Sequence, residues 1–229
     1  MSLDFEKYAN EKSMIGKVSV TIEHALVDSI KSTFSDSHYL SLKVLDFGCG
    51  DGRFFNYFIS KGFCPENIYG TEVSEIRVER CQTLGWKNAV LIKNREKLSF
   101  PDNFFHVITM IEVIEHIPCD DIPFYLKEFS RILKPNGFII LTTPNYPIKR
   151  VYDIFDAIRL QRWVRLKDDP THICPYNYSK IKKTLVQFFP KVEMKIYKSG
   201  PVYPYIPLSF VAHKILGLAF KEEVEKKEM

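Results

Sequence analysis

The stretch Val44-Leu45-Asp46-Phe47-Gly48-Cys49-Gly50-Asp51-Gly52 decides the fold of this chain. Its first half is a short apolar run typical of a buried β-strand, and its second half has glycine at alternate positions. Such glycines let the backbone turn tightly and come close to a ligand where a Cβ would intrude. Gly52 stands one residue too early for the dinucleotide pattern GxGxxG, and Arg53 takes its last position, which disfavours NAD. The stretch therefore predicts a strand, a ligand-binding turn and then a helix.

Strand-like and helix-like patterns alternate on both sides of this turn. Residues 5–34 carry apolar side chains at helical spacing and predict a helical lead-in. Downstream we expect strands at 68–71, 89–93, 105–110 and 138–142, helices at 74–84 and 122–133, and a turn at 134–137. Several of these strands are apolar throughout, which is typical of a parallel sheet covered by helices on both faces. The predicted fold class is α/β, a Rossmann-like three-layer αβα sandwich with a mostly parallel sheet.

The chain changes character after Pro144, where apolar, aromatic and basic residues mix. We interpret this part as a helical insertion after the fifth strand, followed by a helix at 178–188 and a strand at 192–197. The length of 229 residues suits one α/β domain. The expected divisions are a single domain at 1–229 with a helical lead-in at 1–40, an insertion or lid at 146–170, and an apolar and then charged tail at 201–229. The pattern of the tail does not show where the last strand of the sheet lies.

Composition and charge are those of an ordinary globular protein, with 45% hydrophobic and 26% charged residues. The net charge of +4, without a long basic run, does not argue for nucleic acid or anionic lipid as a partner. The five cysteines are odd in number and form no CxxC pair, so we expect reduced thiols rather than disulfides or a zinc site. The sequence shows no signal-peptide pattern and no apolar run of the roughly 18 residues that a spanning helix needs. We therefore expect a cytoplasmic protein.

An acidic residue at the end of the next expected strand adds to the evidence from the glycine-rich turn. The next expected strand ends in Tyr69-Gly70-Thr71-Glu72, which places a carboxylate at the same edge of the sheet. Such an acid can accept hydrogen bonds from both hydroxyls of a ribose. Taken alone, Glu72 is open to interpretation as a solvated loop carboxylate, and the turn as a generic glycine turn. Together they predict a site for a ligand that contains adenosine.

From Lys43 to Pro144 the chain resembles the class I S-adenosylmethionine-dependent methyltransferases. Residues 44–52 are similar to the first motif of that family, and Glu72 is similar to its ribose-binding acid. Lys97-Leu98-Ser99-Phe100-Pro101-Asp102-Asn103-Phe104-Phe105 and Leu133-Lys134-Pro135-Asn136-Gly137-Phe138 resemble two later segments of the family. The resemblance implies the class I methyltransferase fold, with S-adenosylmethionine as the cofactor and S-adenosylhomocysteine as its product.

The same resemblance implies which residues bind this cofactor. Gly48 and Gly50 are expected to approach the methionine moiety, and Glu72 to hold the ribose. Asn94, with Arg95, falls where the family commonly binds the adenine amino group, and an amide oxygen can accept that hydrogen bond. The complete expected set is Asp46, Gly48, Cys49, Gly50, Glu72, Asn94, Arg95 and Ile111.

Candidate catalytic residues follow the expected strand at 105–110. Glu112, Glu115 and His116 share a face if they form a helical turn, and His172 follows the insertion. The string resembles an element of ubiquinone-biosynthesis O-methyltransferases, which use a divalent metal, and of small-RNA 2′-O-methyltransferases, which add a later histidine. We expect Glu112, His116 and His172 to be catalytic, with His116 as a base or orienting group. A metal is not expected to be required, and the set that can hold one is Glu112, Glu115, His116 and His172.

The insertion at 146–170 is the expected lid on the acceptor side. It is rich in apolar residues and carries six lysines and arginines between Lys149 and Lys167. This composition suits an isoprenoid or acyl chain, or peripheral contact with an anionic membrane. The alternative is a pair of short helices that cap the core with their charges in water. The expected partner is a small or lipid-linked acceptor and not a nucleic acid, and composition does not indicate an oligomeric state.

These observations lead to one expected function and two alternatives. The chain is expected to move a methyl group from S-adenosylmethionine to a hydroxyl of a small or lipid-linked molecule, such as a quinone precursor or a glycan sugar. An RNA 2′-O-methyltransferase is one alternative. The other is a non-catalytic module that binds S-adenosylmethionine.

Overall fold

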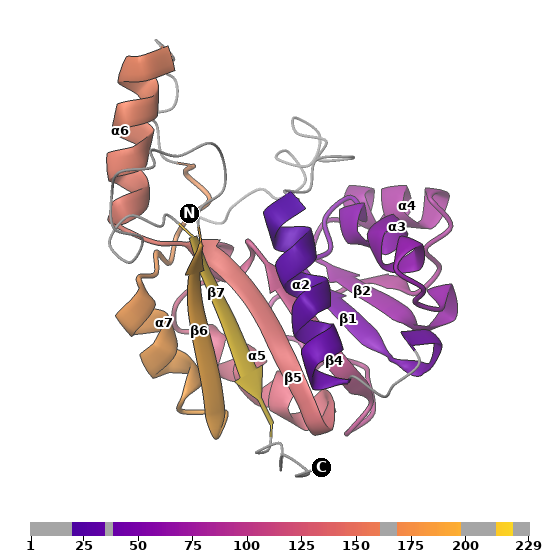
Figure 1. Ribbon diagram of the computed structural model, residues 1–229. Coiled ribbons are helices and arrows are strands. Elements are labelled where there is room, and N and C mark those ends of the chain that lie inside the picture. The colour runs from indigo at the N-terminus through magenta and orange to yellow at the C-terminus, as the bar shows by residue number, and fades with distance from the viewer. Residues whose placement is uncertain (1–19, 35–38, 161–168, 198–213, 222–229) are drawn as a thin grey trace.

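A seven-stranded sheet in the order β3-β2-β1-β4-β5-β7-β6 forms the centre of the protein (Figure 1). The computed structural model describes residues 20–34, 39–160, 169–197 and 214–221. The strands are β1 (Val44–Phe47), β2 (Ile68–Glu72), β3 (Ala89–Leu91), β4 (Phe105–Ile111), β5 (Leu133–Pro144), β6 (Lys191–Tyr197) and β7 (Lys214–Phe220). The first five strands run parallel, and β7 runs antiparallel to both of its neighbours. The predicted α/β class with a mostly parallel sheet is confirmed.

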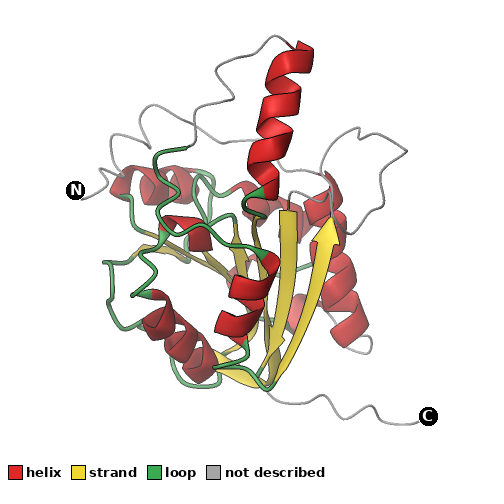
Figure 2. Cartoon of the chain, turned by 90° about the vertical axis from the view of Figure 1, so that its left-hand side faces the viewer, coloured by secondary structure: helices red, strands yellow, loops and turns green. Residues whose placement is uncertain are grey.

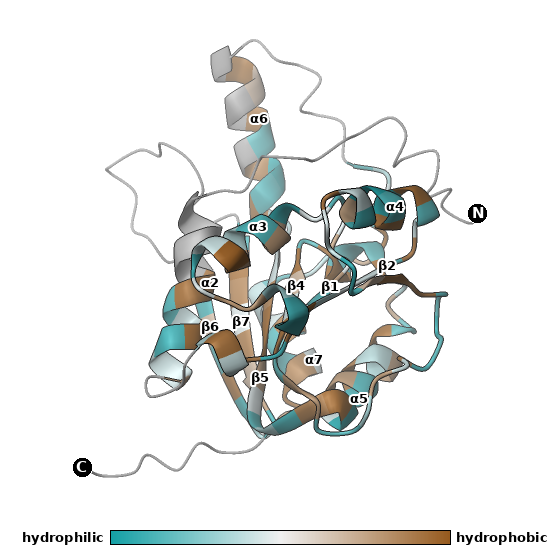
Figure 3. Ribbon diagram, turned by 90° about the vertical axis from the view of Figure 1, so that its right-hand side faces the viewer, coloured by the Kyte–Doolittle hydropathy of each residue, from teal (hydrophilic) through white to brown (hydrophobic). Residues whose placement is uncertain are grey.

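Helices cover both faces of this sheet, as the apolar strands predict. The α-helices are α2 (Val20–Thr33), α3 (Arg53–Ser60), α4 (Glu75–Thr83), α5 (Ile122–Ile132), α6 (Ile148–Leu160) and α7 (Tyr178–Leu185). Short 3-10 helices are η1 (Tyr39–Ser41), η2 (Pro65–Asn67) and η3 (Ile114–His116). One hydrophobic cluster joins the sheet to α2, α3 and α4, and another joins its other face to α5 and α7. Figure 3 shows mainly hydrophobic strands between helices of mixed polarity.

Side chains of alternating direction divide the core between these two clusters. In β1, Val44 belongs to the cluster that contains Phe58 of α3, whereas Leu45 belongs to the cluster that contains Phe129 of α5. All four of these side chains are buried. At roughly 1.5–3 kcal/mol for each fully buried large side chain, the two clusters supply the main driving force for forming the three layers. The layers in turn fix the edge of the sheet at which the parallel strands end.

The last strand of the sheet, which the sequence pattern does not locate, is β7. It lies between β5 and β6 and pairs antiparallel with both, from Lys214 opposite Pro144 to Phe220 opposite Phe138. Its apolar residues are buried because it is an interior strand. The tail therefore contributes an antiparallel strand next to the edge of the sheet.

The predicted turn at 134–137 is not a separate turn. These residues belong to β5, where the pairing with β4 shifts from Phe105 opposite Leu133 to Val107 opposite Phe138. Asn136 has a φ of 62°, which suits an irregularity in the strand. The chain thus bulges at this point and continues as one strand.

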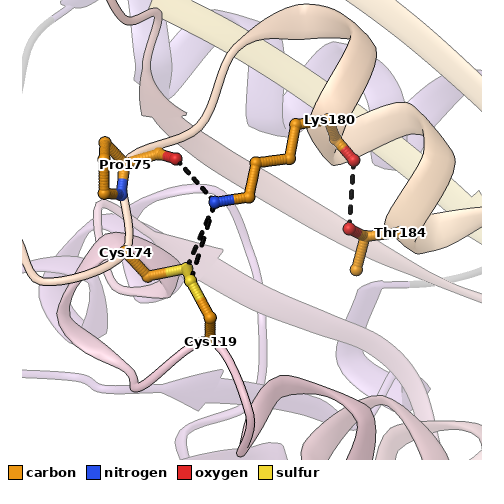
Figure 4. Close-up of a disulfide and its surroundings, with 5 residues drawn as sticks. All are labelled: Cys119, Cys174, Pro175, Lys180 and Thr184. Atoms are coloured by element: carbon orange, nitrogen blue, oxygen red, sulfur yellow. Dashed lines mark hydrogen bonds between the residues drawn. A yellow bond between two sulfur atoms is a disulfide. The ribbon is translucent and has the colours of Figure 1, made fainter.

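A disulfide joins Cys119 to Cys174, contrary to the expectation of reduced thiols (Figure 4). The two cysteines are 55 residues apart in sequence, and the fold places their Cα atoms 5.4 Å apart. The odd cysteine count did not reveal the bond because pairing depends on where the loops meet in space. The remaining cysteines, which are Cys49, Cys64 and Cys81, are free thiols.

Helix α6 confirms the predicted helical insertion after the fifth strand. Figures 1 and 2 both show it projecting beyond the end of β5. The predicted lead-in before residue 20, residues 161–168 of the insertion and residues 201–213 and 222–229 of the tail lie outside the described residues. None of the helices in the described ranges is long and apolar enough to span a membrane.

Candidate functional site

A cavity of about 890 Å³ opens at the carboxyl ends of β1, β2 and β4. This is the edge at which open α/β sheets bind their ligands. Every residue that the sequence predicts for the site lines this cavity, with the exception of Arg95. The predicted cofactor residues and the predicted acceptor residues therefore share one space, as a group-transfer enzyme requires.

The glycine-rich turn is fixed to the neighbouring strand. The backbone N–H groups of Gly48 and Cys49 both donate to the carbonyl oxygen of Thr71, over 2.8 and 3.0 Å. Gly48 has a φ of +73°, and a Cβ built on it would lie only 2.6 Å from the side chain of Val113. Glycine is therefore required here both for its backbone conformation and for space.

Glu72 is buried and serves the same turn. One carboxylate oxygen accepts from the backbone N–H of Gly50 over 2.9 Å, and the other accepts from Val73 over 2.9 Å and Ser74 over 3.2 Å. Since each carboxylate oxygen has two lone-pair positions, a ribose hydroxyl can still donate to Oε2. The structure places this carboxylate on the cavity wall, and its contact with ribose stays a prediction.

Asp46 presents a buried carboxyl to the cavity. Its Oδ1 accepts from the hydroxyl of Thr109 over 2.7 Å, and within the described residues its Oδ2 has no hydrogen-bond partner. Burial raises the pKa of Asp46 to about 7, although the Thr109 hydroxyl opposes the shift. A buried carboxyl oxygen without a partner calls for a donor, and a cationic ammonium of a ligand would satisfy it.

Asn94 lies on the cavity wall but is already engaged on both sides of its amide. The amide nitrogen donates to Asp121 over 3.0 Å, and the amide oxygen accepts from the hydroxyl of Tyr125 over 2.8 Å. The backbone N–H of Arg95 donates to the same hydroxyl, while its guanidinium lies 3.4 Å from Asp121. Tyr125, which lies in the helix predicted at 122–133 and was not predicted as a site residue, thus orients this part of the site. The contact of Asn94 with adenine stays a prediction.

Glu112 stands at the other end of the cavity, directly after β4. Its φ of +57° is unusual for a residue with a side chain. Its backbone N–H donates to the carbonyl of Thr142 over 3.0 Å, and its Oε1 accepts from the hydroxyl of the same residue over 2.9 Å. Its Oε2 forms an ion pair with Lys214. Sequence reasoning missed Lys214 because the strand that carries it was not located.

Glu115 and His116 lie in the short 3-10 helix η3. Glu112 precedes this helix and has a left-handed backbone, so the turn holds only two of the three residues expected in it. Glu115 is fully buried, and its Oε2 accepts from the hydroxyl of Thr143 over 3.0 Å. Its Oε1 has no partner among the residues that the structure describes. Burial, and then the negative charge of Glu112, raises the pKa of Glu115 well above its usual range.

The two predicted histidines meet, with ring centroids 4.8 Å apart. Nδ1 of His116 lies 3.0 Å from the carbonyl oxygen of Thr171. A carbonyl only accepts, so Nδ1 carries the proton and Nε2 of the neutral ring holds a lone pair. Nδ1 of His172 lies 2.7 Å from the hydroxyl of Tyr146. Burial lowers the pKa of both imidazoles, which favours the neutral, proton-accepting form.

Three of the four candidate metal ligands come together. One ligand atom from each of Glu115, His116 and His172 lies within 4.8 Å of the other two. Imidazole nitrogen with carboxylate oxygen is a donor set that suits divalent transition metals. A bound ion there would polarise an acceptor oxygen. Glu112, the fourth candidate, is outside this group and is paired with Lys214.

Comparisons with known proteins agree with this geometry. A family model described as a methyltransferase domain matches residues 21–188. The ubiquinone biosynthesis O-methyltransferase of Pelagibacter ubique is 29% identical over 151 residues, which cover 62% of this chain and 59% of that protein. The ubiquinone/menaquinone biosynthesis C-methyltransferase of Paraburkholderia phytofirmans is 31% identical over 129 residues, covering 53% of this chain and 52% of that protein. The chain thus spans little more than half the length of these curated relatives.

A solved structure has the same fold. The crystal structure of an S-adenosylmethionine-dependent methyltransferase from Archaeoglobus fulgidus aligns with a TM-score of 0.60 and 19% sequence identity, over 86% of this chain and 94% of that one. The cavity meets the needs of the cofactor, since its glycine turn, the carboxylate of Glu72 and the unsatisfied oxygen of Asp46 face one space. The chain therefore belongs to the methyltransferase domain family.

Proposed function

We propose that this enzyme methylates a hydroxyl group of a small or lipid-linked molecule, with His116 as the base. The observation that carries the proposal is the hydrogen bond from Nδ1 of His116 to the carbonyl of Thr171. It fixes the tautomer in which Nε2 accepts a proton, on a ring that lines the cavity. The two relatives named above methylate oxygen in one case and carbon in the other, by their names, so the proposal rests on the site.

The proposed step moves one proton and one methyl group. Nε2 of His116 takes the proton of the acceptor hydroxyl as the oxygen forms its bond to the methyl carbon. The sulfonium cofactor supplies the methyl group and keeps the electron pair of the broken sulfur–carbon bond. His172, fixed by Tyr146, limits the movement of the His116 ring beside it. Most of the rate enhancement would come from holding the acceptor oxygen in line with the methyl group.

A group of exposed apolar residues near the acceptor end supports a lipid-linked acceptor. Val151, Ile154 and Ile158 are 50%, 50% and 59% exposed, and their spacing places them on one face of α6. We call this face the α6 stripe. Helix α6 begins two residues after Tyr146, whose hydroxyl contacts His172. An apolar chain or a membrane surface held by the stripe would bring a lipid-linked hydroxyl close to His116.

The test is a methyl-transfer assay with an acceptor panel of phenols, lipid-linked sugars and short RNA. We expect transfer to a hydroxyl of one of the first two classes, and a loss of roughly 100-fold or more in kcat for His116→Ala. The affinity of this variant for S-adenosylhomocysteine should be unchanged, because His116 lies at the acceptor end. Unchanged kcat in His116→Ala would contradict the assignment of the base.

Other results of the same assay point to other functions. Transfer to RNA alone would establish the nucleic-acid alternative. Cofactor binding without transfer to any acceptor would favour a binding module. Repeating the assay with a chelator decides whether the Glu115, His116 and His172 group acts through a metal, since loss of transfer that a divalent ion restores would require one.

A further inference from the structure

Lys214 is the one cationic side chain that β7 brings to the acceptor end of the cavity. It is the first residue of β7 and pairs with Pro144, the last residue of β5. Lys214 therefore lies beside the carboxyl end of β5. Strand β4, which Glu112 follows directly, is the neighbour of β5 on its other side. The side chain is only 20% exposed and lines the cavity. A long, flexible cation is rarely held so far from water without a defined partner.

The partner, Glu112, is held in a fixed position. Its backbone donates to the carbonyl of Thr142, and the hydroxyl of Thr142 donates to its Oε1. The left-handed backbone at Glu112 is itself unfavourable for a residue with a Cβ and persists only where contacts over-determine it. The carboxylate is thus positioned to hold the ammonium of Lys214 through its Oε2.

An ammonium group has three N–H donors, and only the one to Glu112 has a partner among the described residues. The same charge acts on Glu115, which is next to His116 in η3. The ammonium therefore lies close enough to Glu115 to act on its charge, on the wall of the space in which the acceptor is proposed to bind. A cation at this point attracts an oxygen that carries negative charge.

We propose that the ammonium of Lys214 belongs to the acceptor site and binds an anionic oxygen of the acceptor, next to the hydroxyl that is methylated. The proposal rests on the function proposed above and narrows its acceptor class to molecules with a carboxylate, phenolate or phosphate oxygen near that hydroxyl. By occupying Glu112, the ammonium also keeps this carboxylate from joining Glu115, His116 and His172 as a metal ligand.

The first measurement compares two probes of equal shape on protein loaded with S-adenosylhomocysteine. Titration calorimetry with 2-hydroxybenzoate and with 2-hydroxybenzamide should show at least roughly tenfold preference for the anion in the wild-type protein. The preference should be lost in Lys214→Met and largely kept in Lys214→Arg. Phenyl phosphate as a third probe decides between a carboxylate and a phosphate. Lys195→Met, which removes an exposed lysine of β6, is the matched control and should keep the preference.

A second measurement needs no acceptor. In Lys214→Met the carboxylate of Glu112 is released, so the affinity for Co²⁺ should rise by roughly tenfold or more, and the further change Glu112→Gln should cancel the gain. Equal binding of the two benzoyl probes to the wild-type protein, or unchanged Co²⁺ affinity in Lys214→Met, would overturn the proposal. If the proposed hydroxyl methylation failed instead, the enzyme would show no transfer to hydroxyls while both binding results remained as expected.

Discussion

Among single residues, Glu72 uses one carboxylate both to hold the glycine-rich turn and to line the cavity. It closes the glycine turn through Gly50 and Val73, and it faces the space in which the ribose is expected. Glu72→Ala should weaken binding of S-adenosylhomocysteine by at least roughly tenfold, since it removes the carboxylate that is expected to accept from the ribose and loosens the turn. Titration calorimetry checks this loss. Glu79→Ala, at an exposed position of α4, is the matched control and should bind normally.

Gly48 gives an independent test of the same turn. A valine side chain cannot fit there, because even a Cβ would overlap Val113 and the φ of +73° is strained for any other residue. Gly48→Val should therefore abolish cofactor binding or weaken it by at least roughly tenfold. Normal calorimetric affinity in both Gly48→Val and Glu72→Ala would refute the location of the cofactor site.

Asp46 predicts how cofactor binding depends on pH. Its pKa of about 7 in the free protein means that the carboxyl is largely protonated below neutral pH. Only the ionised form attracts the ammonium of the ligand, so affinity should rise with pH and level off above 7. Below pH 7 it should fall by up to roughly tenfold per pH unit. Calorimetry with S-adenosylhomocysteine from pH 5.5 to 8 measures this slope, and Asp46→Asn should flatten it. A slope that persists in Asp46→Asn would assign the effect to another group.

The residues that sequence alone identified share one property, which is that local pattern reveals them. Short apolar strands directly precede Gly48, Gly50 and Glu72 in the sequence. The neighbouring residues are therefore enough to identify these positions as site residues. Tyr125 and Lys214 also line the cavity, but each comes from an element far along the chain from the residue that it contacts. Their positions depend on how the sheet is assembled, which a linear pattern does not contain.

At the scale of elements, the segment 169–177 completes the acceptor end and is held there from several sides. The carbonyl of Thr171 fixes His116, and the backbone N–H of Cys174 donates to the carbonyl of Glu115 over 3.0 Å. The disulfide to Cys119 adds a covalent link, with the ammonium of Lys180 within 3.7 Å of both sulfurs (Figure 4). This segment is therefore positioned by tertiary contacts more than by secondary structure of its own.

Breaking this disulfide should lower the free energy of unfolding and leave the residues of the expected cofactor site in place. The bond closes a loop of 55 residues, for which the chain-entropy relation gives a contribution of roughly 4 kcal/mol. Cys119→Ser should lower Tm by several degrees, and a reductant should do the same to the wild-type protein but have no further effect on the variant. Thermal unfolding by circular dichroism measures both, and Cys64→Ser, which removes a free thiol, should leave Tm unchanged. An unchanged Tm in Cys119→Ser would mean that the noncovalent contacts alone hold the segment.

Elements were predictable where their residues are buried on both sides or on one regular face. The parallel strands read as apolar runs, and α5 as an amphipathic helix, because each packs in a regular layer. Strand β7 is buried as well, but it was not predictable because Gly217 interrupts its apolar run and a stretch with prolines precedes it. Residues 134–137 have the composition of a turn, yet the pairing of β5 on both sides of them carries the strand through. Tertiary pairing overrides local preference there.

At the scale of the whole molecule, charge and the α6 stripe act together. The insertion that contains α6 is rich in lysine and arginine, which suits an anionic surface, and α6 stands away from the sheet (Figure 1). The three residues of its apolar stripe are exposed. We expect the protein to float with phosphatidylglycerol vesicles, to bind phosphatidylcholine vesicles more weakly, and to be released in part by salt.

The stripe supplies the apolar part of this binding, so removing it should separate the two contributions. The triple variant Val151→Asn, Ile154→Asn and Ile158→Asn should lose vesicle affinity by roughly tenfold or more, because three exposed side chains no longer enter the lipid boundary. Val186→Asn, which changes a 52% exposed residue after α7, is the matched control and should float like the wild-type protein. Calorimetry with S-adenosylhomocysteine should give the same affinity for all three proteins, which shows that the fold is intact.

If the triple variant floated as well as the control, basic residues alone would hold the protein to the membrane. If the wild-type protein did not float at all, the stripe would have to bind the acceptor itself, and the triple variant should then raise KM for a lipid-linked acceptor while leaving a water-soluble one unaffected.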